Sequence, residues 1–128
     1  NSTTKSQTSY STFTQLDIRA GTIISTEKFP EARQPAYKLT IDFGELGTKQ
    51  SSAQITDLYT PEDLEDTQII AIVNFPPKQI GPFISEVLVL GVETDDGIVL
   101  LHPEGDVPDG QLFINSTTDA IFPKDGIC

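Results

Sequence analysis

Apolar and polar residues alternate most clearly in residues 37–43, where Tyr, Leu, Ile and Phe are separated by polar side chains. A period of two places these four side chains on one face of a strand. Gly44 and Gly47 follow directly and favour a turn. We therefore predict a strand with one buried face, ended by a turn.

Six other segments have the composition of strands, because they alternate or are rich in β-branched residues between turn residues. Ala20 and Gly21 in the first of them favour a bulge or sharp bend. The Asp95-Asp96-Gly97 sequence favours a hairpin turn. The predicted strands cover residues 16–26, 49–55, 68–75, 85–92, 97–101 and 111–114.

One segment has strong signals for the start of a helix. Thr60 can cap the helix, Pro61 suits its first position, and Glu62 and Asp63 place acids in the first turn. Three β segments, one short helix and further β segments follow one another in the order of an OB-fold. We therefore predict an all-β (mainly β) fold: a five-stranded OB-fold barrel with a short helix and extra strands at the C-terminal end.

A chain of 128 residues has room for one hydrophobic core. Residues 1–12 are rich in Ser and Thr, and we expect a flexible polar leader there. We place the OB-fold domain at residues 13–114 and a C-terminal tail at 115–128. The tail contains an apolar island, Ile121-Phe122-Pro123, which could dock on the barrel or a partner, although a frayed tail is the simpler expectation.

The net charge of −11 argues against bulk attraction to nucleic acid or anionic membranes, because that attraction needs Lys and Arg. The charge is unevenly distributed, however. Residues 1–50 contain six basic and five acidic side chains, whereas residues 51–128 contain two lysines and fourteen acids. This pattern fits either an acidic solubilising surface with scattered lysines or a local basic patch on an acidic body.

Catalytic and metal-binding patterns are missing from the sequence. His102 is the single histidine and Cys128 the single cysteine, and neither a G-x-S-x-G elbow nor a glycine-rich phosphate loop occurs. We predict a protein that is not an enzyme and needs no metal or cofactor. No apolar run approaches the roughly 18 residues of a membrane span, and no secretory signal is recognisable, so we expect a cytoplasmic protein without membrane insertion.

Five segments in order resemble the CsaA family: LDIRAGTI (16–23), FPEAR (29–33), KQSSAQI (49–55), VNFPPKQI (73–80) and SEVLVLG (85–91). The resemblance implies membership of the tRNA-binding-domain superfamily, related to a domain of methionyl-tRNA synthetase, with an OB-fold and a homodimer. Val87 and Leu88 stand where synthetase-type relatives usually have Gly and Met, which favours the CsaA branch.

Basic and polar residues in these segments could contact phosphates and bases on one face of the barrel. The candidate nucleic-acid-binding residues are Arg19, Lys49, Gln50, Asn74, Lys78 and Ser85. In the structural alternative, Arg19 pairs with Asp17 or Glu86, Asn74 caps a loop, and residues 51–53 are small only to permit close packing.

Two functions remain open at this point. The first is tRNA binding by a homodimer without catalytic activity, with an affinity that falls steeply with salt. The alternative, also implied by the resemblance, is an export-related molecular chaperone for unfolded or pre-secretory polypeptides, with little dependence on salt. Its candidate groove consists of Phe75, Pro76, Pro77, Ile80 and Phe83. A dimeric scaffold without either activity is a third interpretation.

Overall fold

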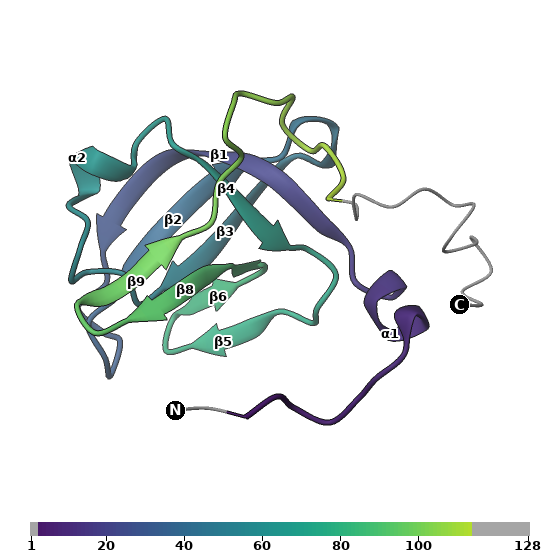
Figure 1. Ribbon diagram of the computed structural model, residues 1–128. Helices are drawn as coiled ribbons and strands as arrows, with labels where there is room; N and C mark the ends of the chain where they lie inside the picture. The colour runs from purple at the N-terminus through teal and green to yellow at the C-terminus, as the bar shows by residue number, and fades with distance from the viewer. Residues whose placement is uncertain (1–2, 114–128) are drawn as a thin grey trace.

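The computed structural model of the chain describes residues 3–113 and consists mainly of strands (Figure 1). Two short helices and one 3-10 turn connect them. In chain order the elements are α1 (Tyr10–Thr14), β1 (Ile18–Lys28), β2 (Tyr37–Asp42), the 3-10 turn η1 (Gly44–Leu46), β3 (Thr48–Ala53), α2 (Pro61–Leu64), β4 (Gln68–Ile72), β5 (Lys78–Ile80), β6 (Phe83–Ser85), β7 (Leu88–Val89), β8 (Gly91–Thr94) and β9 (Gly97–Leu100).

Five strands form one antiparallel sheet in the order β3-β2-β1-β4-β7, and the sheet curls into a nearly closed barrel (Figure 1). Strand β1 is long enough to pair with β4 along its first half and with β2 along its second half. Its residue Thr22 is in register with Asp42 of β2 and with Gln68 of β4. The hairpins β5–β6 and β8–β9 are separate two-stranded sheets. This architecture confirms the predicted all-β OB-fold.

The alternating pattern of residues 37–42 is confirmed as a strand with one buried face. In β2, Tyr37, Leu39 and Ile41 are buried, while the residues between them are partly exposed. They join a single core cluster with Ile23 of β1 and Ile69 of β4, both fully buried. The core therefore lies inside the barrel, and the outer faces of the strands remain available for contacts.

A bulge or sharp bend was predicted at residues 20–21. The bulge is wrong, because Ala20 and Gly21 stay in regular register with β4 and the register of β1 shifts between Ile23 and Ser25 instead. Gly21 has a different role. A Cβ atom at this position would lie 2.7 Å from the Phe43 ring and 2.8 Å from the Ile41 side chain. Glycine is therefore required here because the backbone of β1 approaches the core side chains closely.

The helix predicted after Thr60 is confirmed as α2. Thr60 accepts a hydrogen bond from the Asp63 N–H (3.2 Å), and the Asp63 carboxylate accepts one from the Thr60 N–H (3.0 Å). These two bonds form a capping box, which satisfies N–H groups that a helix start leaves free. The short helix places Leu64, which is fully buried, in the barrel core.

The helix α1 was missed, and its first residues fall within the expected flexible leader. Its sequence, YSTFT, is short and mostly polar, so local propensity alone does not predict it. Phe13 instead packs against the cluster of Ile18, Ile70 and neighbouring apolar side chains and contacts the Phe113 ring at 6.3 Å. The division at residues 12 and 114 stays a prediction, and the tail with Ile121-Phe122-Pro123 lies outside the described residues.

The apolar run of residues 85–92 is not the single strand that was predicted. It contains the end of β6, the two-residue β7 and the start of β8. The hairpin of β5 and β6 was also missed, and the strand predicted to reach residue 75 ends at Ile72. A continuous apolar run has no period that marks where one strand ends and the next begins, which explains these errors. The hairpin turn at Asp95–Gly97 is confirmed, with Gly97 at a φ of +141°.

Residues 111–113 form no regular strand, although one was predicted at 111–114. A single bridge pairs Leu112 with Arg19, and residue 114 lies outside the described range. Nevertheless the segment lies along the free edge of β1, because the N–H of Gly110 donates to Ala20 O (2.8 Å) and the N–H of Phe113 donates to Ile18 O (2.7 Å). Within residues 3–113, no helix is long and apolar enough to span a membrane.

Candidate functional site

The barrel closes along a seam between β3 and residues 85–87, and side chains provide much of the contact. The N–H of Gln50 donates to the Glu86 carboxylate (3.0 Å), and the N–H of Glu86 donates to Gln50 O (2.8 Å). The N–H of Ser52 donates to the Ser85 hydroxyl (3.0 Å). Because side chains replace strand-to-strand backbone bonds here, the two edges can diverge beyond the seam.

The hairpin β5–β6 leads directly into this seam, because Ser85 is the last residue of β6. Lys78 of β5 is in register with Ser85 of β6, so their side chains leave the same face of the hairpin. The Gln50 side-chain amide donates to Ile84 O (3.0 Å) and ties the hairpin to β3. The structure therefore brings together three of the six candidate residues: Gln50, Lys78 and Ser85.

Lys49 is on a different face of β3 from Gln50. It is in register with Ile41, which is fully buried, and neighbouring residues in a strand point to opposite sides. The Lys49 side chain therefore extends from the core-facing side of the sheet, at the end of the barrel, where it remains partly exposed. Consecutive positions in the sequence do not form one patch here.

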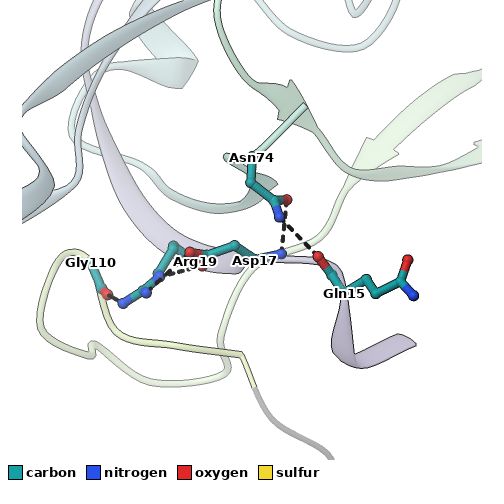
Figure 2. Close-up of polar contacts among 5 residues, drawn as sticks. All are labelled: Gln15, Asp17, Arg19, Asn74 and Gly110. Carbon is teal, nitrogen blue, oxygen red and sulfur yellow. Dashed lines mark hydrogen bonds and ion pairs between the residues drawn. The ribbon is translucent and has the colours of Figure 1, made fainter. Parts of the chain in front are cut away.

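Arg19 and Asn74 meet at a third place, the start of β1 (Figure 2). The Arg19 guanidinium contacts the Asp17 carboxylate at 2.5 Å and donates to Gly110 O at 3.0 Å. The Asn74 side chain accepts from the Asp17 N–H and donates to Gln15 O, both at 2.9 Å. Of the two acids considered as partners for Arg19, the structure has Asp17.

These contacts give the polar groups of Arg19 and Asn74 partners within the chain itself, although Asn74 lies at the surface. The hydrogen bond that Arg19 donates to the Asp17 carboxylate raises the pKa of Arg19 above its ordinary value, while desolvation acts in the opposite direction. Arg19 is consequently charged at every working pH, but its charge is already paired. Within residues 3–113, neither Lys49 nor Lys78 forms an ion pair. These two lysines are the candidate cations that remain available to a ligand.

A cavity of about 610 Å³ opens beside the seam. Its walls are formed by the end of β3 and the residues after it, and by strand β5 with the segment before it. The seam residues, β7 and the β8–β9 hairpin complete the lining. Most of its lining is apolar, but five lining residues have polar side chains: Ser52, Gln54, Lys78, Ser85 and Glu86. The cavity has room here because β3 and β7, the two edge strands of the sheet, are not paired with each other.

Three of the five residues predicted for a peptide groove line this cavity: Phe75, Pro76 and Ile80. Pro77 is not among the lining residues. Phe83 is buried against Phe29, with ring centroids 5.3 Å apart, and Lys38 covers both rings. An apolar side chain that already packs in its own cluster presents little surface to a ligand, so the predicted groove exists only in part.

Gln54 and Glu86 were missed as candidate site residues. Gln54 was assigned to a predicted strand and to the segment 49–55, and Glu86 to the segment 85–91 and as a possible partner for Arg19, but neither was named as a ligand contact. Their position depends on the closure of the seam, which no local pattern indicates. In the part of the chain that the structure describes, no three His, Cys, Asp or Glu side chains are grouped to hold a metal ion. His102 is exposed, with its Nδ1 atom 3.0 Å from Pro103 O.

Comparisons with known proteins match the whole barrel. The family model described as a putative tRNA binding domain matches residues 18–112. The crystal structure of the chaperone CsaA from Bacillus anthracis is 53% identical, covers 85% of this chain and 100% of that chain, and has a TM-score of 0.81. The CsaA chaperone structure from Picrophilus torridus is 52% identical with the same TM-score and covers 84% of this chain and 100% of that chain.

The curated relatives are much longer proteins. Methionine–tRNA ligase of Methanococcoides burtonii is 35% identical over 99 residues, which are 77% of this chain but 14% of the ligase. The chain thus matches one segment of these enzymes. The likeness to CsaA proteins that was expected from the five sequence segments is confirmed by the two crystal structures.

Proposed function

This chain belongs to the family of tRNA-binding domains, and we propose that it binds tRNA as a homodimer and has no catalytic activity of its own. The observation that carries the proposal is the family match over residues 18–112, which covers the barrel and its seam. The absence of catalytic motifs from the sequence supports a binding role.

The RNA-contacting surface in this proposal lies on the seam side of the barrel. Lys78 is exposed and has no ion pair within residues 3–113, so it can neutralise a phosphate. Gln50 and Ser85 lie beside it and supply polar groups. Lys49 extends the positive surface around the end of the barrel. Arg19 and Asn74 support the site in a different way, because their contacts fix the start of β1 (Figure 2).

The proposal is tested by titrating total tRNA against the full chain at two salt concentrations, using Lys49→Glu/Lys78→Glu as the site variant. The matched control is Lys5→Glu/Lys28→Glu, which makes the same change in charge at two exposed lysines outside the surface. Each lost phosphate contact lowers the salt slope by about 1. We expect weaker, less salt-dependent binding in the site variant and a much smaller effect in the control. No binding by the unaltered chain at low salt refutes the proposal.

The homodimer is tested separately by sedimentation of the unaltered chain. A mass of one chain at every concentration would contradict it. A dimer that still binds tRNA in the control variant, but not in the site variant, supports both parts of the proposal together.

A second candidate function is the binding of unfolded polypeptides, including pre-secretory ones, as by an export-related chaperone. The observation that favours it is the mainly apolar cavity with Phe75, Pro76 and Ile80 in its wall, and the two similar CsaA proteins are named chaperones. An unfolded reporter polypeptide would then bind with little salt dependence, and Phe75→Ser would weaken that binding while Phe113→Ser, equally exposed and away from the cavity, would not.

A further inference from the structure

The cavity beside the seam has the size of a small-molecule site, since such sites occupy roughly 300–1,000 Å³ and this one measures about 610 Å³. Phe75 stands in its wall with 43% of its surface exposed. Other parts of the lining are apolar and include Ile98 and Leu100 of β9. A flat aromatic ligand could therefore find a ring to stack on and further apolar surface in the same cavity.

Polar groups facing this cavity still have unused hydrogen-bonding capacity. The Ser85 hydroxyl accepts from Ser52 N–H, but its own proton has no acceptor within residues 3–113. The Glu86 carboxylate uses Oε1 for Gln50, and its Oε2 has no hydrogen-bond partner in the same part of the chain. The Gln54 amide and the Lys78 ammonium are exposed and equally unengaged there.

A purely apolar occupant would bury these groups without partners, which is unfavourable. A nucleotide matches them better. Its base has flat faces for Phe75 and the apolar wall, its edge has donors and acceptors, and its phosphate can pair with Lys78. Glu86 also lines the cavity, and its carboxylate favours ligand groups that donate hydrogen bonds.

We propose that the seam cavity receives one unstacked nucleotide of the bound RNA, and that Glu86 favours a base with an exocyclic amino group. This inference rests on the proposed RNA binding. Phe75 stacks on the base, and Lys78 pairs with the phosphate. The carboxylate of Glu86 accepts from an amino group, as Asp and Glu accept from N4 of cytosine. Uracil has no such group and presents a carbonyl oxygen to the same carboxylate.

The test is an NMR titration of the isotope-labelled full chain with CMP and, separately, with UMP. We expect CMP to shift the Gln54 side-chain amide and the methyl signals of Ile98 and Leu100, and to bind about tenfold more tightly than UMP, since a hydrogen bond to a charged group has about this effect. Glu86→Gln keeps an acceptor for Gln50 N–H and should bring the two affinities close together.

Phe75→Leu supplies the second arm, because it removes the ring and keeps an apolar side chain. Loss of one stacked base weakens binding by about tenfold, so we expect that loss for both CMP and tRNA. Phe113→Leu is the matched control, since Phe113 is also 43% exposed and does not line the cavity. Equal tRNA affinities for the two variants, without cavity shifts on addition of CMP, would overturn the inference.

The failure of this inference and the failure of RNA binding give different results. Salt-sensitive tRNA binding without any effect of Phe75→Leu or any CMP shift refutes the nucleotide site alone. CMP shifts in the cavity without tRNA binding refute the proposed function alone. Competition with an uncharged apolar hexapeptide distinguishes a polypeptide site. If the hexapeptide displaces CMP from the unaltered chain, and does so equally well in the Glu86→Gln variant, the cavity is a polypeptide site and the inference is overturned.

Discussion

The backbone N–H of Gln50 donates to the side-chain carboxylate of Glu86 at 3.0 Å, and the backbone N–H of Glu86 donates to Gln50 O at 2.8 Å. One of these two bonds thus depends on a side chain where a regular strand pair would use only backbone groups. The barrel seam is consequently sensitive to the identity of residue 86, and the cavity begins directly beside it.

We expect Glu86→Ala to lower the free energy of unfolding by about 1–3 kcal/mol, because the Gln50 N–H would lose its acceptor in a partly buried position. Glu86→Gln should cost less, since the amide oxygen can still accept. Urea unfolding followed by circular dichroism measures the difference. Equal stabilities of the alanine and glutamine variants would show that the side-chain bond contributes nothing to the seam.

Gly21→Ala should destabilise the barrel by about 1–3 kcal/mol, because overpacking of a tight core has this cost. The added methyl group would approach the Phe43 ring to 2.7 Å. Gly105→Ala is the control, since no atom lies within 4 Å of a Cβ at that position, and we expect a change within about 0.5 kcal/mol. Thermal or urea unfolding of both variants provides the comparison, and similar values would contradict the packing argument.

Gln68 holds the segment after β9 to the barrel. Its side-chain amide donates to Val107 O at 2.6 Å and accepts from Val107 N–H at 3.1 Å, as a neighbouring strand would. We expect Gln68→Ala to increase amide hydrogen exchange at Val107 and Gly110 while β2 stays protected, because local opening requires only the bonds of that segment to break. Unchanged exchange at Val107 would show that the segment is held by other contacts.

Arg19→Lys should lower stability by about 1 kcal/mol, because lysine lacks the fork that contacts Asp17 and Gly110 together. Arg33→Lys, at an exposed arginine without an ion pair within residues 3–113, serves as the control. We also expect the salt slope of tRNA binding to stay unchanged in Arg19→Lys. A stable variant with weakened tRNA binding would instead identify Arg19 as a direct RNA contact.

Local sequence determined the elements that depend on neighbours along the chain. The alternation in residues 37–43 predicted β2, the Thr60 cap and Pro61 predicted α2, and the Asp95–Gly97 turn predicted the β8–β9 hairpin. In each case a period of two, a capping side chain or a turn residue acts over a few positions. The order of these elements was sufficient for the OB-fold, and five ordered motifs were sufficient for the family.

Only the tertiary structure decided how the candidate residues are grouped. Gln50 and Glu86 are 36 residues apart, and no local signal indicates that they meet at the seam. Lys49 and Gln50 are adjacent in sequence, yet strand geometry places them on opposite faces. Arg19 also donates to Gly110 O, a contact that exists because segment 110–113 lies along β1. The cavity arises where two strand edges separate, and such a space is a property of packed elements that the sequence of any one of them does not specify.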